Sequence, residues 1–256
     1  GSRPFPSSYD VLIGSHILNS GFPTKSANNI SSTPASNIPA KPVKTLSSTE
    51  KPISYPEKGT GKLFRVKNWF YFIGGDLTEE MVRRIENSNY NMVVIQYVPS
   101  EKGWENYNMK EMVRRFHKAK IPKLVIAYID IGQAETVRTY WETGWRVGNP
   151  DWIVSEDPDG WSGNYPVAYW RNEWRNIWIG ENGYMKGIVD ADFDGIYLDW
   201  VEAYSHDPVK ALAVKDGVNS ENEMVRWVLD LAAYGRSRIP GFLVIGQNAA
   251  ELAANN

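Results

Sequence analysis

From about residue 62 onward the chain alternates short apolar segments with amphipathic segments, and this alternation limits the fold more than any other feature. The apolar segments have the length of strands, whereas the segments between them repeat apolar residues at helical spacing. Strands that alternate with helices form a parallel sheet with crossover helices. We therefore predict strands at 69–75, 91–99, 122–132, 194–201 and 241–248, and helices at 77–88, 108–120, 171–191 and 220–238.

Local signals refine the helix boundaries. Thr78 has the residue type of an N-cap, and Ser220 with Glu223 has the spacing of a capping box. The segment 171–191 is predicted to be helical in large part despite Gly180 and Gly183.

Two folds fit this alternation, a doubly wound sheet and a (β/α)8 barrel. GGDL, not GxGxxG, follows the first predicted strand, which disfavours a Rossmann nucleotide site. A barrel places polar residues at the C-terminal ends of several strands. Four predicted strands end in this way, with Gln96 and Tyr97, Asp130 and Gln133, Asp199 and Glu202, and Gln247 and Asn248. We therefore predict the α/β class with a (β/α)8 TIM-type barrel. Because we find only five strands, we expect a barrel that is truncated or incomplete in this chain.

The first part of the chain differs in composition. Residues 1–60 are rich in Ser, Pro, Asn and Thr and have too few apolar residues for a core, so we predict a linker or extended arm there and the barrel domain at 61–256. A strand near 9–18 that pairs with another part of the protein is the alternative. Gly1 and Ser2 resemble residues left by cloning, and we expect a secreted or extracytoplasmic protein whose signal peptide has been removed.

Composition excludes several function classes. The formal net charge of −2 provides no basic field for nucleic acid, and no apolar run approaches the length of a membrane span. The absence of cysteine excludes thiolate nucleophiles and Cys-ligated metals, and His16, His117 and His206 are too scattered for a typical zinc motif. We expect no metal, no cofactor and a monomer.

Aromatic residues are abundant, with 11 Trp and 14 Tyr. They could fill a large core, or they could line a carbohydrate cleft in which flat rings stack on sugar rings. The candidates for stacking are Trp161, Tyr165, Trp170 and Trp200.

The polar strand ends offer carboxylates, amides and tyrosines. This set suits glycoside hydrolysis, which usually needs two carboxyl groups that flank one bond. Asp199 is the strongest candidate, although it could instead cap a helix at 201–204. The second carboxyl group remains open among Glu202, Glu135 and Glu251, of which the last two could simply begin helices.

Two further charged residues have less certain roles. Asp194 precedes its strand, so it should lie at the opposite end of a barrel as a turn residue. Arg138 could pair with one of the acids or bind a hydroxyl-rich substrate, and a surface ion pair is the alternative.

Four blocks of sequence carry a resemblance to a known family. They are AYIDIGQAETVRTYW (127–141), WSGNYPVAYWRNEW (161–174), FDGIYLDWVEAY (193–204) and GQNAAEL (246–252). Together they resemble the endo-α-1,4-polygalactosaminidase-like family of (β/α)8-barrel glycoside hydrolases. The resemblance implies an exported hydrolase of galactosamine-containing polysaccharide. It also implies that Asp199 and Glu251 are the catalytic carboxylates.

The chain departs from the family pattern in the presumed cleft. Gln96 and Tyr97 stand where relatives often have an acid, and Asp130 and Gln133 stand where a small residue and Glu are expected. A relative that binds sugar without cleaving it is therefore one alternative function. An α/β enzyme of another class, such as a deacetylase or a phosphate-handling enzyme, is the other.

Our hypothesis is a hydrolase of a polysaccharide or oligosaccharide in which Asp199 and Glu251 share the catalytic work. Acidic residues would help to bind an amino sugar, which is cationic when it is deacetylated. The substrate-binding residues that we predict are Tyr128, Asp130, Glu135, Arg138, Trp200, Glu202, Gln247 and Asn248.

Overall fold

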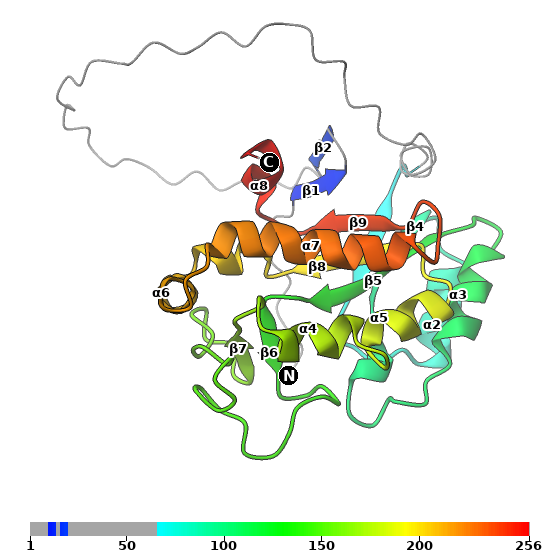
Figure 1. Cartoon of the computed structure of the whole chain (residues 1–256). Helices are drawn as coiled ribbons and strands as arrows, with labels where there is room; N and C mark the ends of the chain where they lie inside the picture. The colour runs from blue at the N-terminus through cyan, green and yellow to red at the C-terminus, as the bar shows by residue number, and fades with distance from the viewer. Residues whose placement is uncertain (1–9, 14–15, 20–65, 256) are drawn as a thin grey trace, which may run out of the picture.

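The computed structural model describes residues 10–13, 16–19 and 66–255, and its centre is a parallel five-stranded sheet (Figure 1). The strand order is β3-β4-β5-β8-β9. The strands run over Trp69–Phe72 (β3), Met92–Gln96 (β4), Leu124–Asp130 (β5), Gly195–Asp199 (β8) and Leu243–Gly246 (β9). All five strands that the sequence predicts are therefore present.

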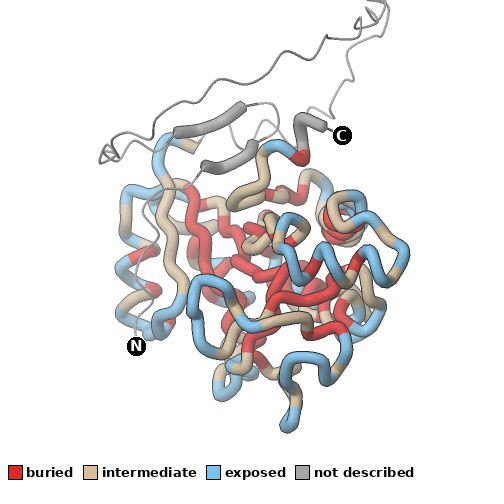
Figure 2. The backbone as a smooth tube through the Cα atoms, turned by 90° about the vertical axis from the view of Figure 1, so that its left-hand side faces the viewer, coloured by how far each residue is buried: buried red, intermediate tan, exposed pale blue. Residues whose placement is uncertain are grey.

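The strand order and the two faces of this sheet identify the barrel architecture. Each parallel strand pairs with the next one along the chain, whereas a doubly wound sheet reverses its order at a switch point. Side chains on one face pack with the helices in a large buried cluster, and the backbone at the centre of the molecule is coloured as buried in Figure 2. The other face carries a second cluster whose members all come from the strands and the residues beside them, as in a barrel interior. The predicted α/β class with a barrel-type sheet is confirmed.

Helices follow the strands at most of the predicted positions. Thr78 caps the first of them, because its hydroxyl accepts a hydrogen bond from the backbone N–H of Met81 at 3.2 Å. The predicted capping box at Ser220 is wrong, since Asn219 is the N-cap and the Ser220 hydroxyl donates to the carbonyl of Tyr204 instead.

The helices are Glu79–Glu86 (α2), Met109–His117 (α3), Asn172–Ile179 (α4), Tyr184–Asp190 (α5), Asp207–Lys215 (α6), Ser220–Arg236 (α7) and Ala250–Asn255 (α8), with 3-10 turns at Val98–Ser100 (η1) and Val201–Ser205 (η2).

The segment 171–191 forms two helices, α4 and α5, where the sequence suggested a largely continuous one. Gly180 ends α4 and Gly183 precedes α5, and both have extended backbone angles. A Cβ atom on Gly183 would lie 2.4 Å from the carbonyl oxygen of Trp178. The chain turns too closely there for any larger residue.

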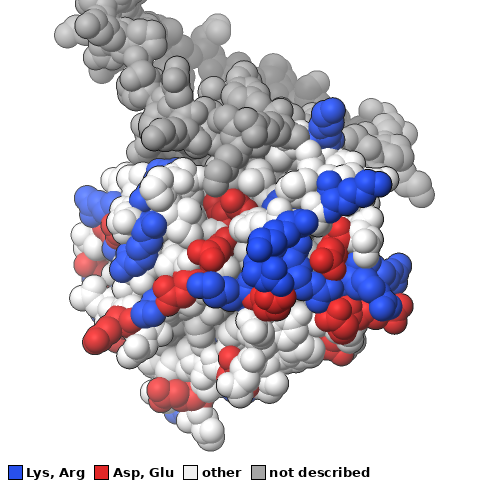
Figure 3. All heavy atoms as spheres, turned by 90° about the vertical axis from the view of Figure 1, so that its right-hand side faces the viewer, with Lys and Arg blue, Asp and Glu red and all other residues white. Residues whose placement is uncertain are grey.

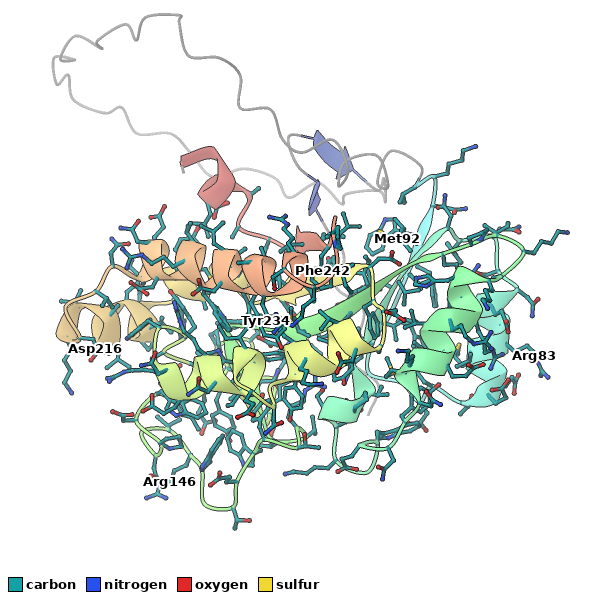
Figure 4. All side chains as sticks on the ribbon, turned by 45° about the vertical axis from the view of Figure 1, so that its right-hand side comes forward. Arg83, Met92, Arg146, Asp216, Tyr234 and Phe242 are labelled. Atoms are coloured by element: carbon teal, nitrogen blue, oxygen red, sulfur yellow. The ribbon has the colours of Figure 1, made fainter. Side chains whose placement is uncertain are left out.

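The long aromatic segment between β5 and α4 contains a small antiparallel pair, Gln133–Glu135 (β6) and Asn164–Pro166 (β7). Its tryptophans pack in a chain, with ring centroids 4.9 Å apart for Trp145 and Trp152 and 5.5 Å apart for Trp152 and Trp174. Trp170 Nε1 donates to Asp216 at 2.8 Å. Asp216 lies at the end of α6 (Figure 4), a helix that the sequence analysis did not predict. Many of the aromatic residues therefore serve packing.

Two short strands near the N-terminus, Asp10–Ile13 (β1) and His16–Asn19 (β2), pair with each other in antiparallel fashion. They fall within the segment for which a linker, or alternatively a strand, was expected. Most of the predicted 1–60 linker lies outside the described residues.

The N-terminal end of the sheet is held by Asp194, which lies directly before β8. Its backbone N–H donates to the carbonyl of Val125 at 2.8 Å, and its Oδ2 accepts from the N–H of Val125 at 3.0 Å. The same oxygen lies 2.7 Å from Nε2 of His117 at the end of α3. Asp194 thus joins β5, β8 and α3 in addition to turning the chain.

We expect Asp194→Ala to lower the free energy of unfolding by about 2–3 kcal/mol, because a buried N–H and an imidazole lose their acceptor. Urea denaturation measures this change. Asp190→Ala is the matched control, since Asp190 pairs with Lys186 on the surface of α5, and we expect a change below about 0.5 kcal/mol. Equal effects of the two variants would contradict this role of Asp194.

Candidate active site

Polar side chains gather at the C-terminal edge of the parallel sheet. Asp130 ends β5 and Asp199 ends β8, and these residues are direct neighbours in the strand register. Tyr128 lies two residues before Asp130 in β5, and it pairs in register with Gln96 of β4 and with Tyr197 of β8. Two of the polar strand ends that the sequence indicates, Asp130 and Asp199, are therefore direct neighbours in the structure.

Asp199 is bound by two donors. The hydroxyl of Tyr128 donates to its Oδ2, and the backbone N–H of Trp200 donates to its Oδ1 at 2.8 Å. Burial and the charge of Asp199 raise the pKa of Tyr128 well above its usual value, so the phenol keeps its proton and remains a donor. The alternative of a helix cap is not supported, because no side chain caps η2, which follows Asp199.

Asp130 is only 3% exposed. Its Oδ1 accepts hydrogen bonds from the backbone N–H groups of Gly132 at 3.1 Å and Gln133 at 2.8 Å. Burial raises its pKa well above the usual value, and the neighbouring charges of Asp199 and Glu135 raise it further. Because two adjacent carboxyl groups resist double ionisation, Asp130 holds its proton to a higher pH than an ordinary Asp does.

A strained turn orients Asp199. Trp200 has left-handed backbone angles, φ 57° and ψ 32°, which are unusual for a bulky residue. Its carbonyl oxygen passes so close to β5 that a Cβ atom on Gly132 would lie 2.2 Å away. Between them, the carbonyl of Ile131 accepts from the buried indoles of Trp174 at 3.1 Å and Trp227 at 3.3 Å. This framework fixes the two strand ends relative to each other.

Glu202 lies in η2, three residues after Asp199, and is half-buried. Burial raises its pKa to about 7, and the charges of Asp199 and Asp159 add to this increase. A hydrogen bond with the side chain of Asn248 acts in the opposite direction. Its Oε2 is buried without a hydrogen-bond partner among the described residues. Glu202 can therefore exchange a proton near neutral pH.

Glu135 and Arg138, both predicted to bind substrate, form a buried ion pair. Arg138 Nε donates to Glu135 Oε2 at 2.6 Å, and Arg138 Nη1 donates to the hydroxyl of Ser100 at 3.0 Å. Both side chains are almost fully buried. The pair joins β6 to η1 inside the protein, which differs from the surface ion pair considered above. It supports the loops around the site and exposes little surface to a substrate.

The residues after β9 approach the site from its other side. Oε1 of Gln247 and Oδ1 of Asn248 are buried and have no hydrogen-bond partner within the described ranges. Glu251 lies in the first turn of α8 and is exposed. The hydroxyl of Tyr204 donates to its carboxylate, which lowers the pKa of Glu251 below the usual value. Glu251 is therefore an ionised group next to η2.

A loop at 155–163 borders this site, and sequence reasoning named Trp161 in it but missed Ser155 and Asp157. Asp157 Oδ2 accepts from Gln133 Nε2 at 2.6 Å, and the hydroxyl of Ser155 lies 3.0 Å from Nε2 of His206. The ring of His206 packs edge-on against Trp200, with centroids 6.0 Å apart. The sequence DPDG at 157–160 is a strong turn signal, but it does not indicate which strand the turn contacts.

The described surface over α2 and α3 carries no patch of a single charge. Over α2 and α3, basic and acidic side chains are interspersed (Figure 3), and Arg115 pairs with both Glu79 and Glu86. In the ranges that the structure covers, no group of three residues could hold a metal ion. No helix among them is long and apolar enough to cross a bilayer.

We expect Asp130→Asn to stabilise the protein relative to the wild type increasingly as the pH rises from about 4 to about 7. Above the usual Asp pKa of 3.8, the unfolded wild type releases a proton that folded Asp130 retains, so its stability falls, whereas Asn has no proton to release. Urea denaturation across this pH range measures the difference. Asp192→Asn is the control, because Asp192 is exposed. A difference that is independent of pH would contradict the raised pKa of Asp130.

The chain has relatives in bacteria and archaea. It is 33% identical over 214 residues to an uncharacterized protein of Deinococcus radiodurans, covering 83% of this chain and 63% of that protein. It is 33% identical over 190 residues to an uncharacterized protein of Thermotoga maritima, covering 72% of this chain and 53% of that protein. The chain thus spans between about half and two-thirds of the length of these relatives.

Solved structures show a weaker likeness. The chain has a TM-score of 0.44 and 16% identity to Ega3 of Aspergillus fumigatus, solved in complex with galactosamine, over 69% of this chain and 57% of that one. It has a TM-score of 0.46 and 10% identity to the glycoside hydrolase domain of PelA from Pseudomonas aeruginosa, over 73% and 61%. Scores this low carry no argument about the site.

The family comparison is more decisive. The model of glycoside-hydrolase family GH114 matches residues 86–256, which include the carboxylates at the C-terminal strand ends. This match and the 33% identity over most of the chain confirm the resemblance that the sequence blocks carry. The chain therefore belongs to glycoside-hydrolase family GH114.

Proposed function

We propose that this chain forms the catalytic face of a secreted glycoside hydrolase that cleaves galactosamine-containing polysaccharide. The observation that carries the proposal is the cluster of carboxyl groups around Asp199, in which neighbouring groups differ in their tendency to hold a proton. Burial raises the pKa of Asp130 well above its usual value, and Glu202 has a pKa of about 7. Glycoside hydrolysis requires one protonated and one ionised carboxyl group.

The pKa values support a division of roles. Glu202 donates its proton to the glycosidic oxygen as the bond to the sugar carbon breaks, because it is the half-buried carboxyl group that titrates near neutrality. Asp199 and Glu251 supply the ionised carboxylates, which stabilise the positive charge that develops on the sugar and attack its carbon or activate water. The lowered pKa of Glu251 suits this ionised role.

The charge of the site supports an amino sugar as substrate. Asp159, Asp199 and Glu202 lie close enough for the first two to raise the pKa of the third. A deacetylated hexosamine is a cation, so these acids would attract it. The four sequence blocks that resemble polygalactosaminidases narrow the sugar to galactosamine. The Ser- and Pro-rich first segment supports export.

We expect Asp199→Asn to lower the rate of product release from partially deacetylated galactosaminogalactan by at least about 100-fold while the protein stays folded, because the variant loses a carboxylate at the reacting centre. Product analysis measures the rate, and circular dichroism checks the fold. We expect a loss of similar size for Glu251→Gln. A wild-type rate in either variant would remove that residue from the catalytic pair. Retained binding without turnover by the wild type would instead indicate a glycan-binding module.

We expect the activity of the wild type to fall as the pH rises through about 7, because Glu202 then loses the proton that it donates. In Glu202→Gln this decrease should disappear and the remaining activity should be low at all pH values. The measurement is kcat/KM as a function of pH on the same polymer. If Glu202→Gln keeps both the activity and the pH profile of the wild type, Glu202 is not the proton donor.

A further inference from the structure

Trp161 stands apart from the other tryptophans. It is 37% exposed, whereas every other tryptophan in the chain is half-buried or buried. Most of the others have packing roles, such as the two indoles that bind the carbonyl of Ile131. An indole that is this exposed presents a flat apolar surface that a ligand can reach. Trp161 is therefore the tryptophan most accessible to a ligand among those of the described chain.

The backbone of Trp161 is fixed even though its side chain is exposed. Its N–H donates to Asp157 Oδ1 at 3.0 Å, and its carbonyl accepts from the N–H of Asn164 at 3.2 Å. Asp157 is itself held by the side chain of Gln133 in β6 and also accepts from the N–H of Asp159 at 2.8 Å. The indole is thus presented by a well-connected turn, which reduces the entropy that a ligand contact must overcome.

This turn borders the cluster around Asp199. Ser155 at its start contacts His206, whose ring packs against Trp200, the residue after Asp199. Asp159 lies close enough to Glu202 for its charge to act on that carboxyl group. Trp161 follows Asp159 by two residues and its N–H donates to Asp157, so the turn that carries the exposed indole borders the proposed active site.

We propose that Trp161 forms an outer sugar-binding subsite, where its indole stacks on a pyranose ring of a polysaccharide chain that extends beyond the reacting bond. The apolar face of a pyranose matches a flat indole, and the nearby carboxylate of Asp159 accepts hydrogen bonds from hydroxyl or ammonium groups. This inference rests on the proposed carbohydrate substrate. The subsite would increase the affinity for long saccharide chains and would not change the affinity for short ones.

The test compares the binding of α-1,4-linked galactosamine oligosaccharides of two lengths to the full chain. Calorimetry is done in an Asp199→Asn background, so that the ligand is not cleaved. We expect Trp161→Ala to weaken binding of a hexasaccharide about tenfold, equivalent to about 1.4 kcal/mol, and to leave disaccharide affinity unchanged. Trp161→Phe keeps a flat ring and should restore most of the loss. Tyr90→Ala is the matched control, because Tyr90 is also 37% exposed but follows α2 and precedes the N-terminal end of β4.

The outcomes separate the subsite from the catalytic proposal. If the wild type shows no turnover but Trp161→Ala selectively weakens hexasaccharide binding, hydrolysis is rejected and the subsite stands. If the wild type cleaves the polymer and Trp161→Ala binds both ligands as before, the subsite is rejected. A hexasaccharide that does not bind, or an equal loss in Tyr90→Ala, also overturns the subsite.

Discussion

The arrangement of the molecule depends on the register between β5 and β8, which places Asp130 beside Asp199 at the end of the sheet. Two carboxyl groups at this spacing in a buried region cannot both be ionised without a large electrostatic cost. Burial raises the pKa of Asp130, and two backbone N–H donors hold its carboxyl group in place. Asp199 instead accepts from Tyr128 and Trp200 at the edge of the interior. A shift of one residue in this register would turn one of the two carboxyl groups toward the helices and separate them.

The register is maintained by packing on the face that the helices cover. The left-handed turn at Trp200 is strained, and such turns persist only where the surrounding structure holds them. Here Gly132 provides the room for the close approach, and Trp174 and Trp227 bind the carbonyl of the intervening Ile131. The tryptophans of α4 and α7 thereby connect the large core to the geometry of the site. Aromatic residues of the core therefore help to fix the geometry of the site. Trp161 is the only tryptophan of the described chain that is exposed.

The five strands could be predicted from the sequence because buried parallel strands are nearly continuous apolar runs. The polar strand ends could be predicted because a barrel places the C-terminal ends of its strands on one face. It could not predict contacts between distant residues. The pairing of Gln133 with Asp157 depends on the path of a 24-residue excursion, which no local pattern encodes. The spacing of Glu135 and Arg138 fits either a surface pair or a substrate contact, and only the fold shows that both are buried. Asn219 and Ser220 are both good caps, so local preference alone could not choose between them.

Polar groups at the N-terminal ends of the strands have hydrogen-bond partners, whereas several at the C-terminal ends have none among the residues that the structure describes. The paired groups contribute to stability, and the unpaired groups are available to a ligand. At the N-terminal end, the ammonium group of buried Lys123 donates to three backbone carbonyls, and Asp194 binds both a strand and His117. At the C-terminal end, oxygens of Glu202, Gln247 and Asn248 are buried without partners in the described chain. Leaving a buried acceptor unpaired destabilises a protein by about 1–3 kcal/mol. The two amide oxygens are acceptors, as is Glu202 when it is ionised, so a ligand that satisfies them brings hydrogen-bond donors such as hydroxyl groups.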